Sequence, residues 1–440
     1  MGTNPHRELP RKLGALDAAS IVVGVVIGSG IFLTPPEVAR SLGSKNLILG
    51  VWIVTGLLSF CGALALAELG ATMPATGGQY VYLREAYGPL WAFLYGWITF
   101  LVIWTGGTAA IAVGFSLYLA YFVPLTATEG KLVSVALVAA LTAVHYRGVR
   151  LGAGVQNALN ALKLAGIAIL VGGAFLSGAA PAGTSPAAAA AFSWSQFGGA
   201  MVACLFTYEG WNAVSFMAGE IREPHRNLPL GLGLGMVVII AVYTLVNAAA
   251  LRVLSVAEIA ASDRLGALIA ERSIGPQGAA LVTATILLAI AGSTNGCLMT
   301  GPRVYFSQAR DGLFFRRFTA IHPRFETPAF SIALQGVVTA VFSLSGSYEL
   351  LLSYSVFGSW VFYLLTVGAV VVLRVRQPGR ERPYRMWGYP ATPLVFCVVA
   401  LAFLVNTVVT RPLPSLAALG LMAAGVPLYY YWRGKGPAHG

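Results

Sequence analysis

The sequence predicts an all-α integral membrane protein that forms a single transmembrane domain over residues 1–440. Of its 440 residues, 57% are hydrophobic and only 10% are charged, whereas soluble domains carry about 25% charged residues. The apolar residues fall into runs long enough to cross a bilayer, and most lysines and arginines lie in the short polar connections between runs. The net charge of +12 therefore indicates how the chain is oriented in the membrane, and it does not indicate a surface that binds nucleic acid. A soluble multidomain protein is excluded.

Twelve segments reach the length of about 20 mostly apolar residues that a spanning helix needs. They are residues 13–41, 46–72, 85–123, 131–149, 151–178, 195–222, 228–254, 273–309, 328–345, 347–375, 387–409 and 413–432. Residues 179–194 read as a low-complexity loop, and residues 255–272 are polar enough to form a short surface helix.

The distribution of positive charge predicts that both termini lie in the cytoplasm. With the N-terminus inside, the inner connections, in which we count Arg303, hold most of the 28 lysines and arginines. The outer side holds Arg40, Lys45, Lys131, Arg252, Arg264, Arg272 and Arg411. Short loops rich in Lys and Arg stay inside, and an even number of helices agrees with this orientation.

The first apolar segment is interrupted at its centre by Gly28-Ser29-Gly30, within IVVGVVIGSGIFLTPP. Irregular backbone at membrane depth is tolerated only where protein buries it or where it lines a cavity. Backbone N–H groups freed at the start of a second half-helix form an anion site, and a carboxylate is the expected guest. The alternative is a small-residue packing face, since Gly24 and Gly28 are four residues apart.

The sixth segment has a matching interruption in Phe206-Thr-Tyr-Glu-Gly-Trp211. The two interruptions lie five helices apart, and five is odd, so the second set of five helices is inverted relative to the first. We expect repeats over residues 13–178 and 195–375, followed by two further helices over 387–432. Paired interruptions of this kind mark the substrate site of a secondary transporter.

Lys163 is a lone charge well within the fifth segment, in NALNALKLAGIAILVG. A central lysine costs about 2.5–3.5 kcal/mol on insertion scales, so it should face the bundle interior. We expect it to bond backbone carbonyls near Val23 to Ile27 and hydroxyls of the eighth helix, as a fixed cation where a relative would bind sodium. The alternative is a structural lysine near the inner boundary.

Glu209 is the matching acid in the sixth helix. It either points at a substrate ammonium or ties down its own loop, and both interpretations stay open. Glu68 and Asp17, near the inner ends of the second and first helices, read as interface or gate contacts.

Polar and aromatic side chains crowd the sixth and eighth segments. Phe206 and Tyr208 could form a lid, while Trp211 reads as packing and Asn212 could satisfy unwound backbone. The island of Ser293, Thr294 and Asn295 faces either a cavity or another helix.

The residues favour binding over bond breaking. No nucleotide motif, paired metal ligands or Ser-His-Asp spacing occurs, so we expect neither an enzyme, a cofactor nor a metal site. The four cysteines lie singly in apolar runs and predict no disulfide framework.

Several stretches resemble the L-amino-acid transporter branch of the amino acid–polyamine–organocation superfamily. They are VVIGSGIFLTPP, ALAELGATMPATGGQYVYLREAYGPL, FTYEGWNAVSFMAGEIREPHRNLPL, AGSTNGCLMTGPRVYFSQARDG and RPYRMWGYPATPLVF. The resemblance implies a LeuT-type 5+5 inverted-repeat fold with two additional helices. It also implies alternating access, in which helices 1, 2, 6 and 7 rock against the others.

The resemblance also implies roles for residues. Backbone N–H groups of Gly28, Ser29 and Gly30 would hold the substrate carboxylate, and Phe206 would be the occluding ring. Lys163 would match a lysine that goes with sodium-independent transport. The carbonyls expected to hold the substrate ammonium are those of Val26, Ile27, Phe206 and Glu209.

The expected function is sodium-independent exchange of neutral L-amino acids across the plasma membrane. A proton-coupled symporter of the same fold is the alternative within this class, and a membrane receptor or sensor is the alternative from another class. Animal members of the branch pair with a glycoprotein through a cysteine between helices 3 and 4. The corresponding loop here, VPLTATEGK, lacks cysteine, so no disulfide-linked partner is expected.

Overall fold

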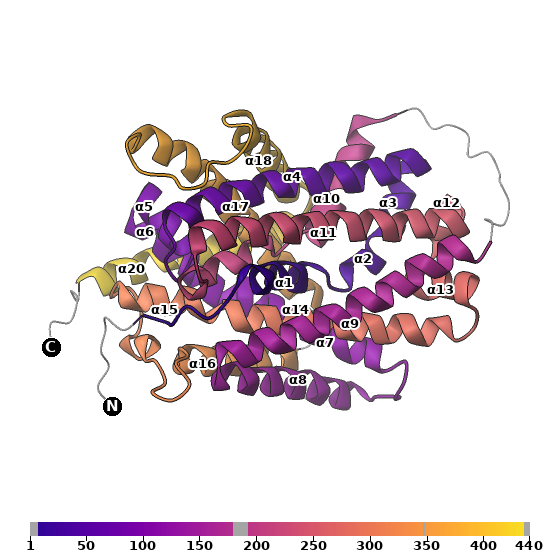
Figure 1. Ribbon diagram of the computed structural model, residues 1–440, viewed down its shortest axis with the longest axis horizontal. Coiled ribbons are helices and arrows are strands. Elements are labelled where there is room, and N and C mark those ends of the chain that lie inside the picture. Colours follow the sequence, from indigo (N-terminus) through magenta and orange to yellow (C-terminus); the bar gives the residue numbers. More distant parts are fainter. Residues whose placement is uncertain (1–7, 179–191, 346–347, 435–440) are drawn as a thin grey trace.

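The computed structural model describes residues 8–178, 192–345 and 348–434 of the chain (Figure 1). Within these ranges the regular structure is helical, apart from one isolated parallel bridge between Leu13 and Ile221. The all-α class predicted from composition is therefore confirmed.

The helices have the following bounds in chain order. The first half contains α1 Ala15–Val26, α2 Gly30–Leu33, α3 Pro35–Leu42, α4 Lys45–Thr72, α5 Gln79–Tyr87, α6 Pro89–Ile98, η1 Thr99–Ile103, α7 Trp104–Leu119, α8 Ala127–Arg147 and α9 Val149–Leu176. The second half contains α10 Trp194–Thr207, η2 Trp211–Glu220, α11 Pro224–Val253, α12 Val256–Ala261, α13 Leu265–Ile274, α14 Gly278–Thr300, α15 Pro302–Arg310, η3 Arg316–Thr319, α16 Ala329–Ser345, α17 Tyr348–Arg376, α18 Ala391–Thr410, α19 Pro412–Ala423 and α20 Gly425–Gly434.

Ten helical stretches in the described residues are long and apolar enough to cross a membrane. The predicted segments 195–222 and 328–345 fall short of that length. The first is split into α10 and η2, and the second contains the shorter apolar helix Ala329–Leu344. The structure thus supports a multi-pass membrane protein, and the number of twelve spans stays a prediction.

Helical geometry stops at both interruptions that the sequence singles out. α1 ends at Val26 and α2 begins at Gly30, so Ile27 to Ser29 are not helical. α10 ends at Thr207 and η2, a 3-10 helix, begins at Trp211 after Gly210, whose φ of 106° lies in the left-handed region. Glycine adopts this conformation without the steric penalty that other residues pay.

Other segments differ from the prediction at glycine and proline. The third segment begins earlier, as α5, and turns at Gly88 before α6. The eighth segment is divided at Gly301-Pro302 into α14 and α15, because proline lacks the N–H that would continue the helix. The expected surface helix is two short helices, α12 and α13.

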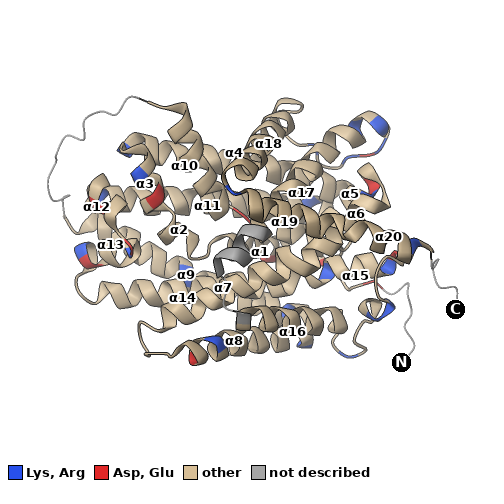
Figure 2. Cartoon of the chain, turned by 180° about the vertical axis from the view of Figure 1, so that it is seen from behind, with Lys and Arg blue, Asp and Glu red and all other residues tan. Residues whose placement is uncertain are grey.

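The helices form an elongated bundle in which α1 lies near the centre and packs against α11, α14 and α9 (Figure 1). The first and the last described residues, Glu8 and Gly434, lie at the same end of the bundle, hereafter the terminal end (Figure 1). Most charged residues lie toward the two ends of the bundle (Figure 2). This arrangement agrees with a protein whose middle is surrounded by hydrocarbon.

Candidate functional site

The two interrupted helices meet at their interruptions. A Cβ atom placed on Gly30 would lie 3.1 Å from Cγ2 of Thr207, and one placed on Gly210 would lie 2.5 Å from Cγ1 of Val25. The hydroxyls of Thr34 and Thr207 are 2.7 Å apart. Glycine at position 30 therefore lets α2 approach the end of α10. Glycine at position 210 lets the connection after α10 approach α1.

Tyr243 of α11 joins the two interruptions. Its buried hydroxyl lies 2.9 Å from the carbonyl oxygen of Val26 and 3.0 Å from that of Thr207, which are the last residues of α1 and α10. Each helix end leaves carbonyls without partners, and such groups in a membrane need a donor. Nothing in the sequence marks Tyr243 as a site residue, because a tyrosine in an apolar helix usually only packs against its neighbours.

Lys163 is fully buried and donates to three carbonyl oxygens at the end of α1. Its Nζ lies 3.1 Å from Val23 O, 3.3 Å from Gly24 O and 2.9 Å from Ile27 O. The expected contacts with the backbone of residues 23–27 are confirmed. The expected contact with the eighth helix is indirect, since Ser293 Oγ of α14 donates to Gly24 O at 3.0 Å.

The three backbone N–H groups expected to bind a carboxylate differ in whether they already have an acceptor within the protein. The N–H of Gly28 already donates to Val26 O at 2.9 Å. Those of Ser29 and Gly30 have no acceptor among the described residues. Two of the three donors are thus available at the start of α2.

The carbonyls expected to hold an ammonium are also partly occupied. Val26 O accepts from Tyr243 and Gly28, and Ile27 O accepts from Lys163. Phe206 O accepts a long bond of 3.5 Å from the Glu209 N–H. Each carbonyl has two lone pairs, so Ile27 O and Phe206 O keep accepting capacity, whereas Val26 O keeps it only while the Tyr243 hydroxyl donates to Thr207 O instead.

A cavity of about 890 Å³ reaches this region from the end of the bundle opposite the termini. Ser29, Phe32 and Leu33 contribute the wall from the first helix. The other walls come from the end of α7, from residues 262–271 around α13, and from α14. Of the predicted site residues, this lining contains Ser29, so the cavity reaches the residue directly before α2.

Phe206 and Tyr208, the two residues predicted to form a lid, pack against different helices. Phe206 is half-buried, with its ring centroid 5.9 Å from that of Phe403 in α18. Tyr208 is fully buried and donates to Trp52 O at 3.1 Å. Both rings pack against neighbouring helices in this conformation.

Trp211 and Asn212 belong to a buried cluster with α17. Trp211 stacks on Tyr363 with centroids 4.9 Å apart, and the Tyr363 hydroxyl donates to Asn212 Oδ1 at 2.8 Å. Asn212 Nδ2 in turn donates to Gln79 Oε1 at 2.5 Å. The cluster fixes the start of η2 and does not line the 890 Å³ cavity.

The polar island of α14 faces α1 and α9. Thr294 bonds within its own helix, to Ile290 O, whereas Asn295 Nδ2 donates to Gln156 Oε1 at 2.7 Å. Gln156 then contacts Asn160, which donates to the carbonyl and hydroxyl of Ser20, both at 2.6 Å. This amide chain holds α1 to α9 and α14. The signal for it was present in NALNALK, where polar residues recur at helical spacing before Lys163.

Glu209 has one carboxylate oxygen, Oε2, that is buried and unpartnered among the described residues. The side chain thus lies at the second interruption with no cation paired to it in the described part of the chain. Asp17 accepts from Asn157 and from the N–H of Gly14, as expected for an interface contact.

The terminal end is closed by a buried ion pair. Arg303 Nε donates to Glu220 Oε1 at 2.7 Å and its Nη2 to Oε2 at 3.2 Å, and both side chains are at most 1% exposed. Arg303 was expected in an inner loop, and this was wrong: it lies within α15. The N–H groups of Lys12 and Leu13 bond the Glu220 carbonyl, which ties the first described residues to the end of η2.

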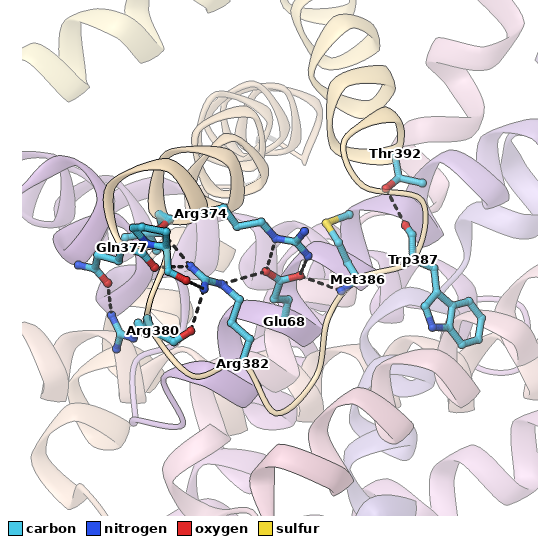
Figure 3. A network of polar contacts seen from close by, with 10 residues as sticks. Glu68, Arg374, Gln377, Arg380, Arg382, Met386, Trp387 and Thr392 are labelled. Carbon is cyan, nitrogen blue, oxygen red and sulfur yellow. Dashed lines mark hydrogen bonds and ion pairs between the residues drawn. The ribbon is translucent and has the colours of Figure 1, made fainter.

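Glu68 of α4 is the centre of a second network at this end (Figure 3). It accepts from Arg374 Nε and Nη2 at 2.8 and 2.6 Å, and from the N–H of Met386 at 2.7 Å. Arg382 Nε lies 3.6 Å away. The expectation that Glu68 makes an interface contact is confirmed, and the contact joins α4 to α17 and the following loop.

No group of three or more His, Cys, Asp or Glu side chains suited to a metal ion occurs in the described ranges. The arrangement at the interruptions instead offers backbone donors, backbone acceptors and one buried ammonium. Such groups suit the recognition of a small zwitterion.

Comparison with known proteins agrees with this geometry. The model of the family described as amino acid permease matches residues 13–424. The chain belongs to the amino acid permease family. This permease is 30% identical to the serine/threonine exchanger SteT of Bacillus subtilis (strain 168) over 425 residues, which is 96% of the chain and 97% of the relative.

Two human proteins are similarly related to the permease. It is 30% identical to b(0,+)-type amino acid transporter 1 of Homo sapiens, covering 92% of the chain and 84% of the relative. It is 32% identical to large neutral amino acids transporter small subunit 2 of Homo sapiens, covering 97% of the chain and 82% of the relative. The relatives are transporters, and amino acid transport across a membrane is the function that the family and the fold support.

Proposed function

We propose that this permease exchanges neutral L-amino acids across the plasma membrane without sodium, by alternating access. The observation that carries the proposal is the position of the Lys163 ammonium, which donates to the carbonyls of Val23, Gly24 and Ile27. A protein cation at this place supplies the positive charge that a bound sodium ion would supply. Because the cation is covalently attached, no ion gradient is consumed.

The substrate site would lie between α2 and the second interruption. The N–H groups of Ser29 and Gly30 have no protein acceptor and stand at the positive end of α2, so they would bind the carboxylate. Carbonyls of Val26, Ile27, Phe206 and Glu209 would bind the ammonium, with the Ser29 hydroxyl helping at the carboxylate. Phe206 would close over the site, with Tyr208 and the α14 residues Ser293, Thr294 and Asn295 bordering it.

The conformation supports alternating access. The 890 Å³ cavity opens away from the termini, while the Glu220–Arg303 pair and the Glu68 network close the terminal end. We propose that the terminal end faces the cytoplasm, which makes this an outward-facing state. The repeats would be residues 13–178 and 195–375, with residues 387–432 outside them.

Uptake of labelled amino acid into proteoliposomes tests the proposal. Uptake should require unlabelled amino acid inside, and it should persist when a large organic cation replaces sodium. Dependence on sodium, or equal uptake into empty liposomes, would contradict an obligatory sodium-independent exchanger.

A proton-coupled symporter is the second candidate, because Lys163 is titratable and meets only carbonyls among the described residues. Concentrative uptake driven by an imposed pH gradient, without internal amino acid, would decide for it. A sensor would bind amino acids and move none.

We expect no disulfide-linked partner. All four cysteines are free, and they lie within α4, α10, α14 and α18 rather than in an exposed loop. Migration of the protein from native membranes as the same species with and without reductant would support this expectation.

A further inference from the structure

A second cavity, of about 430 Å³, lies at the terminal end, and the proposed substrate site does not use it. Its walls come from the segment before α1, the turn before α5, the end of η2 and the end of α15. The charged residues in its lining are Glu8, Arg11, Arg84, Arg310 and Asp311.

The charged side chains in this lining fall into two groups. Arg84 and Asp311 form an ion pair, and the Tyr80 hydroxyl also donates to Asp311 at 2.8 Å. Burial, and then the Asp311 charge, raise the pKa of Tyr80 well above its usual value, so this hydroxyl remains a donor. Glu8, Arg11 and Arg310, in contrast, form no ion pair in the described part of the chain.

The walls behind these charges are closely packed and polar. A Cβ atom on Gly219 would lie 2.2 Å from Thr76 Oγ1, and one on Gly77 would lie 2.6 Å from Cβ of Ser307. Arg310 is held over the Phe306 ring at 5.7 Å from the centroid. The cavity is therefore bounded by packed backbone, and its lining includes exposed charges of both signs that form no ion pair with another described residue.

One wall is part of the closure of the terminal end. Arg11 directly precedes Lys12 and Leu13, whose N–H groups bond the Glu220 carbonyl at 2.8 and 3.0 Å, and Glu8 lies three residues before Arg11. A molecule bound to Glu8 and Arg11 would thus contact the segment that must move when this end opens.

We propose that the 430 Å³ cavity is a docking site for the amino acid that arrives from the cytoplasmic side. Its carboxylate would bind Arg11 and Arg310, and its ammonium would bind Glu8. A zwitterion matches these unpaired charges, whereas an inorganic anion would leave the Glu8 carboxylate without a partner. This inference rests on the proposed exchange. It adds that an amino acid arriving from the cytoplasmic side first binds at this cavity.

Exchange kinetics in right-side-out and inside-out membrane vesicles test the proposal. In inside-out vesicles, whose outer solution faces the terminal end, Arg310→Gln should raise the half-saturation concentration for amino acid about threefold to tenfold. In right-side-out vesicles the same variant should keep the half-saturation concentration of the unaltered protein. Arg310→Lys retains the charge and should stay within about twofold.

Arg317→Gln is the matched control, because Arg317 is exposed at the same end and does not line the cavity. Equal half-saturation for Arg310→Gln and the unaltered protein in both preparations would overturn the docking site. An equal rise in both, or competition by inorganic phosphate as strong as by amino acid, would overturn it as well. Absence of exchange by the unaltered protein would overturn the proposed function, and the docking site with it.

Discussion

The ammonium of Lys163 lies 2.9 Å from the carbonyl oxygen of Ile27, the residue at which α1 stops being helical. One side chain of α9 thus satisfies the end of another helix and brings a positive charge to it. This pairing links the local structure of the first interruption to the proposed mechanism, and it can be tested directly.

Lys163→Ala should reduce exchange at least tenfold while the protein still folds. The variant removes one donor from each of three carbonyls. Val23 O keeps the N–H of Ile27 and Gly24 O keeps the Ser293 hydroxyl, so among the described residues Ile27 O is the group left unsatisfied, at about 1–3 kcal/mol. Ser293→Ala removes only one of the donors to Gly24 and should have a smaller effect. Proteoliposome exchange and size-exclusion profiles measure both. Lys131→Ala, at the exposed start of α8, is the control. Normal exchange by Lys163→Ala would refute the fixed-cation mechanism.

Gly30→Val should abolish amino acid binding and leave expression unchanged. A Cβ at this position already approaches Thr207 to 3.1 Å, and the two methyl groups of valine would crowd the free N–H groups of α2. Gly154→Val is the control, because a Cβ on Gly154 meets nothing within 4 Å. Binding measured by thermal shift with amino acid should disappear for the first variant only. If Gly30→Val binds normally, the carboxylate is held elsewhere.

Tyr243→Phe should slow exchange, because it removes the hydroxyl shared by Val26 O and Thr207 O. The loss of one buried hydrogen bond corresponds to about 0.5–1.5 kcal/mol, or roughly a twofold to tenfold change in rate. Tyr82→Phe is a matched control, since the buried hydroxyl of Tyr82 has no partner among the described residues. Equal rates for the two variants would show that the hydroxyl of Tyr243 is dispensable.

Glu220→Gln should lower the melting temperature in detergent. Arg303 would keep its charge in a site where it is 1% exposed, and breaking a buried pair costs about 3–5 kcal/mol. Replacing both partners, as Glu220→Leu with Arg303→Met, should recover part of the loss. A melting temperature that does not change in Glu220→Gln would mean that the pair does not hold this end closed.

Substrate analogues should reveal recognition of both backbone groups of an amino acid. Methyl esters lack the carboxylate charge, and decarboxylated amines lack the group altogether, so both should compete poorly with the parent amino acid. The measurement is inhibition of labelled uptake at equal concentrations. Equal competition by an amine without a carboxylate would indicate an amine transporter.

Features that depend on local chemistry could be predicted from the sequence. A lysine within an apolar run is costly in a membrane, and glycines at the centre of a spanning segment weaken its helix. Lys163 and Gly28-Ser29-Gly30 could therefore be identified from the sequence as candidate site residues. Several helices end at glycine or proline, as at Gly88 and Gly301. Pro302 was not predicted to be a helix boundary, because the expected eighth segment runs past it to residue 309.

Long-range pairings could not be predicted in the same way. Arg303 and Glu220 are separated by 83 positions, and nothing local distinguishes Arg303 from a loop arginine. Tyr243 and the aromatic residues that border the second interruption resemble ordinary packing until the fold brings them together. The position of Phe206 against Phe403, away from the large cavity, also depends on how α18 packs.

The Tyr243 hydroxyl has a single proton and two acceptors at nearly equal distance, Val26 O at 2.9 Å and Thr207 O at 3.0 Å. The proton can be donated fully to one of the two carbonyls at a time. Among the described residues, Val26 O alone of the two has a second donor, the Gly28 N–H. An α-ammonium carries three protons. When the hydroxyl donates to Thr207 O, both helix ends have a donor and Val26 O keeps one lone pair. We expect the ammonium of a bound amino acid to take that lone pair and so to hold the Tyr243 hydroxyl on Thr207 O.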